Sequence, residues 1–410
     1  MNNNFYSGFK IKGMRIILQY LMIFMMTACI VGCGVSRKVN RLWNFNSLFD
    51  EENIVENFRS LPEYVPFHIV HKGDEVFEFS PALRQIPEYF EFRGKTWNMK
   101  ELLKDTWTTG FIVVKNDQIL FEDYYLGNTP DTLNISWSMG KSFVSALIGI
   151  AIGEGLIESI QIPVSDIVPE LKNTGYEGVR LKDVLQMSSG VRFNEDYDAF
   201  FSDINRMGRT VALGKSINEF AASLEREREP GAYNHYVSMD TQVLGMVLKS
   251  ATGKTPSQYL EEKIWRKIGM QSDAKWLVDD DNMELVFGTL NATLKDYARF
   301  GRLYANYGNW NGHQVVPSEW VKDSTTPDAP HLMPGNNPMS SYKMGYGYQW
   351  WIPENPKGDF MALGVYGQYI YVNPEKKMVI VKISAFPFWK DDLDTNDVMM
   401  AWFQYLAQNL

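Results

Sequence analysis

The alternation of apolar and polar positions predicts strands towards both ends of the chain and helices between them. Residues 111–114 and 119–125 are apolar runs separated by the polar segment 115–118, which is the pattern of a β-hairpin. A final amphipathic stretch, 396–408, is typical of a helix packed on a core. Four apolar runs of strand length precede it: 346–352, 359–363, 368–372 and 378–383.

The middle of the chain has helical periodicity. From Ser138 to Leu156, apolar residues recur at three- and four-residue steps, and Gly155 is placed to end a buried helix. Helical patches such as 242–250 and 257–268 follow, and no strand-like alternation dominates there. The order strands, helices, strands, helix predicts an α/β domain assembled from both ends of the chain, with a helical insertion.

These patterns divide the chain into four parts. Residues 1–33 are predicted to be a leader, and residues 34–105 a tether and an irregular N-terminal extension. An α/β domain is predicted from 106–165 together with 290–410, and a mainly helical domain from 166–289.

The leader has the features of an export signal. Three basic residues precede a short apolar run, 16–26, which is too short for a membrane span. The run is followed by Ile30-Val31-Gly32-Cys33, which resembles a bacterial lipobox and predicts lipidation of Cys33. Ala28-Cys29 is a weaker alternative, and an uncleaved anchor helix is another. We therefore expect an exported lipoprotein, anchored to a membrane and facing the periplasm or the cell exterior.

Composition narrows the possible chemistry. With 45% hydrophobic and 14% aromatic residues the 410-residue chain is a folded protein, and its net charge of -9 makes a nucleic-acid partner unlikely to bind. Both cysteines lie in the leader, so the remaining chain has no thiol nucleophile and no disulfide. The five histidines show no metal-binding spacing, and there is no Gly-x-Ser-x-Gly elbow or phosphate-binding loop. We therefore expect no metal and no cofactor.

A serine followed three residues later by a lysine suggests a nucleophile with its own base. The pattern occurs four times, starting at Ser7, Ser138, Ser272 and Ser340, but only Ser138 stands at the head of an apolar helix. There Lys141 would face Ser138, and burial would lower the lysine pKa enough for it to accept the serine proton. A helix-capping serine with a solvated lysine is the equally weighted alternative at this point.

A second segment carries a family resemblance. Residues 230–245 contain Pro-Gly, then Tyr236-Val237-Ser238, then Leu-Gly in a helix. Together with Ser138-x-x-Lys141, this resembles the serine β-lactamase and penicillin-binding-protein superfamily. Within it, the class C and esterase branch and the 6-aminohexanoate-dimer hydrolases are the most similar. The resemblance implies a β-lactamase/transpeptidase-like α+β fold, an α/β sandwich whose antiparallel sheet is flanked by helices, with an all-helical insertion.

The same resemblance implies roles for further residues. Tyr236 would be the general acid and base, with Tyr233 as a nearby competitor, and Ser238 would contact the substrate. Tyr197 would close over the substrate, although a surface tyrosine is a nearly equal interpretation.

The third family motif is altered in this chain. Where the family has Lys-Thr-Gly or His-Thr-Gly, the chain has Ala362-Leu363-Gly364. The resemblance implies that Gly364, Gly367 and Gln368 contact the substrate. It also implies that the backbone N–H groups of Ser138 and Val365 stabilise the oxyanion. The lost cation and hydroxyl normally hold a carboxylate, so their absence weakens a β-lactamase assignment.

The sequence thus predicts an exported serine hydrolase that cleaves a small-molecule amide or ester through an acyl-enzyme. A β-lactamase or D-Ala-D-Ala carboxypeptidase is the alternative enzyme. A catalytically silent lipoprotein that binds cell-wall peptide is the alternative from another class. The sequence leaves the oligomeric state open.

Overall fold

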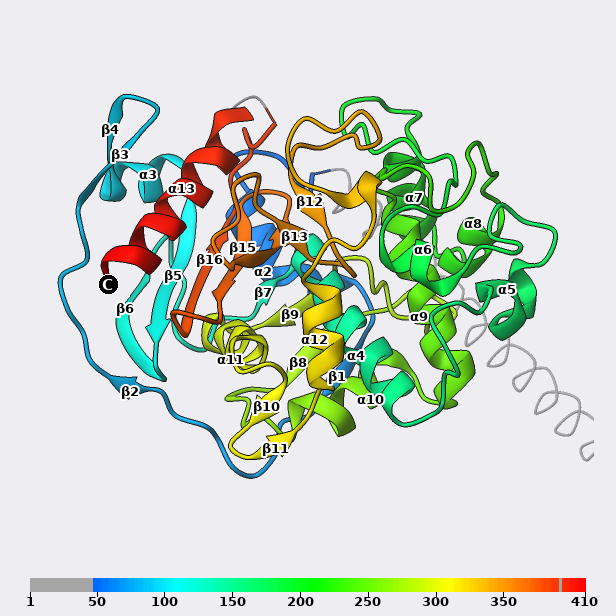
Figure 1. Cartoon of the computed structure of the whole chain (residues 1–410), viewed down its shortest axis with the longest axis horizontal. Coiled ribbons are helices and arrows are strands. Elements are labelled where there is room, and N and C mark those ends of the chain that lie inside the picture. Colours follow the sequence, from blue (N-terminus) through cyan, green and yellow to red (C-terminus); the bar gives the residue numbers. More distant parts are fainter. Residues whose placement is uncertain (1–46, 391–392) are drawn as a thin grey trace, which may run out of the picture.

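The computed structural model describes residues 47–390 and 393–410 of the chain (Figure 1). Its main sheet has eight strands in the order β12-β13-β14-β15-β16-β5-β6-β2. Neighbouring strands are antiparallel except β2, which lies parallel to β6 at one edge. The strands are β2 (Ser80–Pro81), β5 (Thr108–Lys115), β6 (Gln118–Tyr124), β12 (Gly345–Tyr346), β13 (Trp351–Ile352), β14 (Phe360–Gly364), β15 (Gln368–Asn373) and β16 (Met378–Ser384).

The predicted hairpin is confirmed as β5 and β6. Lys115 pairs with Gln118, and the two residues between them, Asn116 and Asp117, both have positive φ. Asn and Asp tolerate this conformation, which matches the right-handed twist of the two strands. The three runs over 359–383 are likewise confirmed as β14, β15 and β16, whereas 346–352 is broken into β12 and β13.

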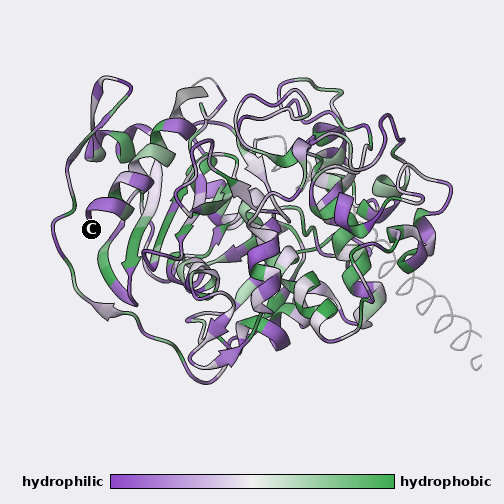
Figure 2. Ribbon diagram, viewed as in Figure 1, coloured by the Kyte–Doolittle hydropathy of each residue, from purple (hydrophilic) through white to green (hydrophobic). Residues whose placement is uncertain are grey.

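Helices cover both faces of the main sheet (Figure 1). On one face α13 (Leu393–Asn409) packs against Phe111 and Val113 of β5, and its Trp402 and Phe403 are fully buried. On the other face α11 (Leu294–Ala305) contacts β15 and β16. Apolar residues run through the strands between these helices, while the outer helix faces are mixed or polar (Figure 2). The core therefore lies in two layers, one on each side of the sheet.

A helical region adjoins the sheet and is centred on two buried helices. These are α4 (Lys141–Gly153) and α9 (Ser238–Thr252), which contact each other and are buried over most of their length. The 3₁₀ turn η1 (Trp137–Gly140) leads into α4. The surrounding elements are α5 (Val164–Ile167), η2 (Pro169–Leu171), α6 (Leu181–Leu185), α7 (Asp203–Ala212), α8 (Ile217–Ala222), α10 (Pro256–Leu260) and the π-helical turn η3 (Glu261–Trp265).

A second, four-stranded sheet joins segments that are far apart in sequence. Its strand order is β1-β8-β9-β7, with β1 (Phe67–Val70), β7 (Asn134–Ile135), β8 (Ala274–Leu277) and β9 (Leu290–Ala292). The sequence pattern did not predict β8, which lies within the stretch expected to be helical. Between α11 and β12 lie β10 (Asn309–Trp310), β11 (His313–Gln314), α12 (Ser318–Ser324) and η4 (Pro330–Leu332).

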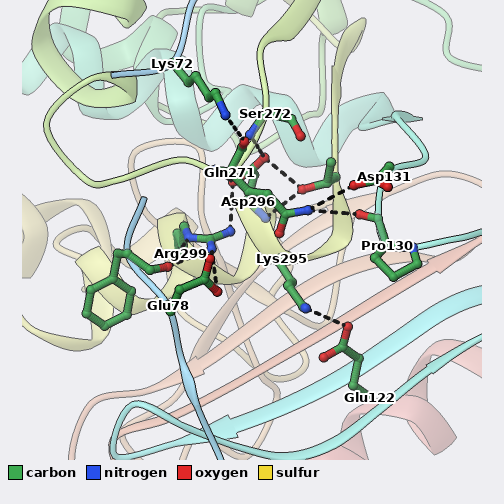
Figure 3. A network of polar contacts seen from close by, with 12 residues as sticks. Lys72, Glu78, Glu122, Pro130, Asp131, Gln271, Ser272, Lys295, Asp296 and Arg299 are labelled. Atoms are coloured by element: carbon green, nitrogen blue, oxygen red, sulfur yellow. Dashed lines mark hydrogen bonds and ion pairs between the residues drawn. The ribbon is translucent and has the colours of Figure 1, made fainter. Parts of the chain in front are cut away.

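The N-terminal extension is more regular than its Pro- and Gly-rich sequence suggests, so that expectation is corrected. It contains α2 (Ile54–Tyr64), the hairpin of β3 (Tyr89–Phe92) and β4 (Lys95–Asn98), and α3 (Met99–Asp105). Buried Arg299 of α11 fixes the extension by donating to the carbonyl oxygen of Phe77. Asp296 accepts from Arg299 at 3.0 Å and from the backbone N–H of Gln271 at 2.7 Å (Figure 3). This buried network ties the extension, α11 and the segment before β8 together.

Candidate active site

Ser138 lies in the 3₁₀ turn η1 and not in the first turn of the α-helix, which begins at Lys141. Trp137, directly before it, has φ +43°, a left-handed conformation that bulky residues rarely adopt. Strained backbone of this kind costs on the order of 1–3 kcal/mol and occurs preferentially at functional sites. The predicted helix start at Ser138 is therefore corrected by three residues, and the turn sets Ser138 apart from the helix.

Lys141 lies close to the Ser138 hydroxyl. Its Nζ is 2.9 Å from Ser138 Oγ, and it also donates to the carbonyl oxygen of Phe287. The lysine is only 2% exposed, and burial lowers its pKa to about 7. A near-neutral amine can accept a hydroxyl proton at physiological pH, which a solvated lysine cannot do. The requirement of burial inferred from the sequence is thus met.

Tyr236 borders this pair. Its ring centroid is 5.1 Å from Lys141 Nζ, and the ring stacks on Trp351 at 5.7 Å. Burial and the nearby Glu195 charge raise the pKa of Tyr236, while a hydrogen bond with the Ser138 side chain opposes that rise. The structure therefore brings together Ser138 from η1, Lys141 from the start of α4 and Tyr236 from the loop before α9.

Glu195 is a neighbour of this group that the sequence analysis did not select. Its Oε1 accepts from the backbone N–H of Ser238 at 2.7 Å, and its Oε2 is buried without a hydrogen-bond partner. Burial raises the pKa of Glu195, and the charge of Lys141 lowers it. Acidic residues on loops are usually solvated, so the only sequence signal was its place in Glu195-Asp196-Tyr197.

A pocket opens directly at Ser138. Val365, Tyr197 and Ser238 line it together with Ser138. Tyr197 packs edge-on against Trp389 at 5.4 Å, and its pKa is raised by burial and by Glu195. Four of the predicted site residues therefore share one cavity.

The three residues predicted to contact the substrate at the end of β14 and in the following turn and strand do not line the pocket. A side chain at Gly364 would come within 2.8 Å of the Ser136 carbonyl oxygen, so glycine here allows β14 to approach the nucleophile turn. Gln368 is fully buried, and its amide bonds the backbone of Ser384 and of the β14–β15 turn. A side chain at Gly367 would face Ser384 and Lys382. Neither Gly367 nor Gln368 lines the pocket, so their placement favours shaping the turn over contacting the substrate.

Two further expectations concern the periphery of the molecule. Cys33 and the leader lie outside the described residues. Within residues 47–390 and 393–410, no helix has the length and apolar character needed to cross a membrane. The same residues contain no group of three or more His, Cys, Asp or Glu side chains arranged to hold a metal ion.

A serine in a 3₁₀ turn beside a buried lysine of lowered pKa, between a mainly antiparallel sheet and a helical region, is the arrangement of a serine hydrolase of the transpeptidase-like type. The chain belongs to the β-lactamase family, because the family model described as Beta-lactamase matches residues 99–400. This confirms the resemblance and the fold class inferred from the sequence.

Individual relatives agree with this assignment. The chain is 28% identical over 338 residues to a 6-aminohexanoate-dimer hydrolase of Paenarthrobacter ureafaciens, covering 80% of this chain and 85% of the relative. A solved structure from Bacillus anthracis, provisionally named a 6-aminohexanoate-dimer hydrolase, superposes with a TM-score of 0.79 at 26% identity. That match covers 88% of this chain and 96% of the other. The hydrolase EstCE1, described as having promiscuous acyltransferase activity, shares the fold with a TM-score of 0.57 at 12% identity, over 73% of this chain and 95% of its own.

Proposed function

We propose that the protein hydrolyses a small-molecule amide or ester through an acyl-enzyme on Ser138. The observation that carries this proposal is the 2.9 Å contact between Ser138 Oγ and the amine of buried Lys141, whose pKa is lowered to about 7. A serine hydroxyl is a weak nucleophile until a neighbouring base accepts its proton, and this lysine has the position and the pKa to do so.

The reaction then has two halves. In the first half, Ser138 Oγ bonds to the carbonyl carbon as Lys141 takes the proton. Tyr236 donates its hydroxyl proton to the leaving amine or alcohol as the bond to the carbonyl carbon breaks. Lys141 then returns a proton to Tyr236. In the second half, water attacks the acyl-enzyme and returns the proton to Ser138. The N–H groups of Ser138 and Val365 are proposed to hold the oxyanion in both halves.

The relatives support an amide or ester bond as the target. The relative from Paenarthrobacter ureafaciens is named for hydrolysis of 6-aminohexanoate dimer, a linear amide. A β-lactamase or D-Ala-D-Ala carboxypeptidase would need to hold a substrate carboxylate, and the Lys-Thr-Gly cation is replaced by Ala362-Leu363-Gly364. A catalytically silent lipoprotein is disfavoured because Ser138, beside the lysine of lowered pKa, also lines a pocket that a reactant can enter.

Substitution of the nucleophile tests the proposal. We expect Ser138→Ala to lower hydrolysis of p-nitrophenyl acetate by about 10⁴-fold or more and to abolish labelling by a fluorophosphonate, because no bond to the acyl group can form. Ser272→Ala, in another of the Ser-x-x-Lys matches, is the control. Equal rates for wild type and Ser138→Ala would refute the mechanism, and rapid nitrocefin turnover would favour the β-lactamase alternative.

We further propose that the enzyme is exported and lipidated on Cys33. The support is the basic leader, the short apolar run and the lipobox-like Ile30-Val31-Gly32-Cys33. Mass spectrometry of the protein expressed in a bacterial host should find residues 1–32 removed and a lipid on Cys33. A Cys33→Ala variant that fractionates with membranes in the same cleaved form would contradict lipidation.

A further inference from the structure

The pocket at Ser138 is built almost entirely from apolar groups. Its cavity volume is about 120 Å³, and three separate parts of the chain supply its walls. One wall comes from the N-terminal extension with Leu48, Phe49 and Leu61, and a second from α7. The third is the stretch between β8 and β9, including Leu285 and Phe287.

Among the described residues that line the pocket, none carries a formal charge. Some of the polar ones are already engaged in the fold. Asn205 Nδ2 donates to the carbonyl oxygens of Tyr197 and Ala199, and Thr289 Oγ1 donates to that of Leu285. The carboxyl of Glu195 is not part of the lining and accepts from the Ser238 backbone. A substrate group in this pocket would therefore find neither a cation nor an anion to pair with, which disfavours charged groups.

Helix α7 turns its apolar side to the pocket and its charges away. Ile204, Met207, Gly208 and Val211 follow the i, i+3, i+4, i+7 spacing of one helix face, and all four line the pocket. Arg206 pairs with Asp203, and Arg209 lies 4.3 Å from the ring of exposed Phe200.

Gly208 leaves space in this wall. A Cβ built at Gly208 would meet no atom within 4 Å, and its φ is not in the left-handed region. Glycine lowers helix stability by roughly 1 kcal/mol relative to alanine, and neither backbone conformation nor close packing requires it here. Because Gly208 lines the pocket, the missing side chain leaves volume open at this wall.

The extension packs against the pocket lining through aromatic contacts. Phe49 stacks on Tyr366 with ring centroids 5.2 Å apart and an interplanar angle of 10°. Phe58 of α2 packs edge-on against Trp137, the residue before the nucleophile. Both partners, Tyr366 and Trp137, line the pocket next to Val365 and Ser138.

The position of the general acid decides which half of the substrate enters. Tyr236 and Lys141 do not line this pocket, whereas Ser138 and Val365 do. The leaving group must lie beside the group that protonates it, which places it outside the pocket. The group that stays bonded to Ser138 is then the one that extends inward.

We propose that this pocket binds the unbranched apolar chain of an uncharged acyl group, and that Gly208 sets the length of chain it accepts. The inference rests on the proposed acyl-enzyme mechanism and specifies its substrate class. It differs from recognition of a zwitterionic amide of an amino acid such as 6-aminohexanoate, because the acyl chain of that amide ends in an ammonium that would have to enter the uncharged pocket.

A chain-length series tests the pocket. Burying a methylene contributes about 0.8 kcal/mol, so kcat/KM for p-nitrophenyl esters should rise about threefold to fourfold per methylene, or about 100-fold from acetate to hexanoate. Lengthening the alcohol side of alkyl acetates should give a much flatter series. The 8-aminooctanoyl ester should react at least about tenfold more slowly than the octanoyl ester, since its ammonium would have to enter the apolar pocket.

Variants in α7 test the role of Gly208. In Gly208→Phe the ratio of octanoate to acetate kcat/KM should fall at least about tenfold, because the ring occupies the space of the chain end. Thr210→Phe adds the same ring at a position on α7 that does not line the pocket, and its ratio should match wild type. Gly208→Ala, which adds only one methyl group, should retain most of the ratio.

Binding without turnover separates this inference from the mechanism. Octanamide should raise the melting temperature of Ser138→Ala, whereas acetamide and 8-aminooctanoate should not, and Gly208→Phe should remove the shift. A flat acyl series with Ser138-dependent hydrolysis, or a preference for the amino ester, would overturn the pocket assignment and leave the mechanism standing. Hydrolysis that persists in Ser138→Ala, together with octanamide binding, would overturn the mechanism and leave the pocket.

Discussion

Among the residues that the structure describes, two lysines are buried, and each lies beside a serine and a tyrosine. Lys141 begins α4, and Lys382 lies in β16 of the main sheet; they are 2% and 0% exposed. Burial lowers the pKa of each to about 7. Each amine donates to a serine hydroxyl, Ser138 or Ser384. Each also lies near a tyrosine ring, at 5.1 Å from Tyr236 and 5.7 Å from Tyr369.

The two sites differ in whether a reactant can reach the serine hydroxyl, and in the groups that surround the lysine and the tyrosine. Ser138 opens into the pocket, whereas Ser384 does not line it. The hydroxyl of Tyr369 donates to Asn396 of α13, away from any substrate space. Lys141 also interacts with the carboxyl of Glu195, while burial alone accounts for the lowered pKa of Lys382. A lysine–serine contact with a lowered pKa is therefore not enough to make a site, because a reactant must also reach the hydroxyl.

The largest expected contrast is between the lysines themselves. Lys141→Met should lower p-nitrophenyl ester hydrolysis by about 10³-fold, because a general base typically contributes 10²–10⁴-fold. Lys382→Met should stay within about threefold of wild type in the same assay. Similar losses in two folded variants, judged by circular dichroism, would mean that the buried lysine in the sheet also serves catalysis.

Substitution of the two neighbouring tyrosines should likewise affect catalysis at one site and stability at the other. Tyr236→Phe removes the proposed proton donor and should lower kcat by about 10²-fold with little change in stability. Tyr369→Phe removes the hydrogen bond to Asn396 and should lower the free energy of unfolding by about 1 kcal/mol, leaving kcat unchanged. Urea unfolding and steady-state kinetics measure the two effects; a Tyr236→Phe enzyme with normal kcat would exclude that tyrosine as the acid.

The pH dependence of the free energy of unfolding should reveal the lowered pKa of Lys382. Its pKa is about 7 in the folded protein against 10.5 ordinarily, so the unfolded chain binds more protons between these values and stability rises with pH across that range. From pH 7 to pH 9 the lysine contributes roughly 2–3 kcal/mol to that rise. Lys382→Met should be more stable than wild type at pH 7, and its advantage should shrink by this amount at pH 9. An advantage independent of pH would show that Lys382 keeps its ordinary pKa.

The smallest expected effect concerns Glu195. Its negative charge raises the pKa of Lys141, so Glu195→Gln should lower that pKa further. The neutral amine is then available at lower pH, and the acid limb of the kcat/KM profile should move down by about 1 pH unit or less. Asp198→Asn changes an exposed acid on the same loop, 82% exposed at its side chain, and should leave the limb in place. A shift to higher pH in Glu195→Gln would contradict this electrostatic coupling.

The sequence predicted those elements that are determined by interactions between residues close together in the chain. The β5–β6 hairpin followed from apolar runs on either side of Asn116-Asp117, and β14 to β16 from apolar runs separated by turns. Neighbouring residues carry the information for these strands. The spacing of Ser138 and Lys141 next to a buried helix suggested a pair but left a capping serine equally open, and the family resemblance around Tyr236 decided between them.

The elements that the sequence did not predict depend on distant partners. The four residues of β8 form a strand because β1 and β9 pair with it on either side. The run 346–352 is broken at Gln349, whose φ is +62° and whose buried amide bonds the Leu185 carbonyl oxygen. Glu195 is buried because Ser238 and Lys141, distant in sequence, meet it in the fold. No pattern within a short window contains these contacts.

The ring contact between Phe49 and Tyr366 joins a pocket wall that precedes the family match to a residue inside that match. Leu48, Phe49 and Leu61 form a pocket wall, yet they precede residue 99, where the match to the family begins. Ser138, Lys141 and Tyr236 all lie inside the matched part. One wall of the pocket therefore lies outside the matched part of the chain, whereas the other two walls and the proposed catalytic residues lie inside it. Substitutions at Leu48, Phe49 or Leu61 can therefore reshape that wall without altering Ser138, Lys141 or Tyr236.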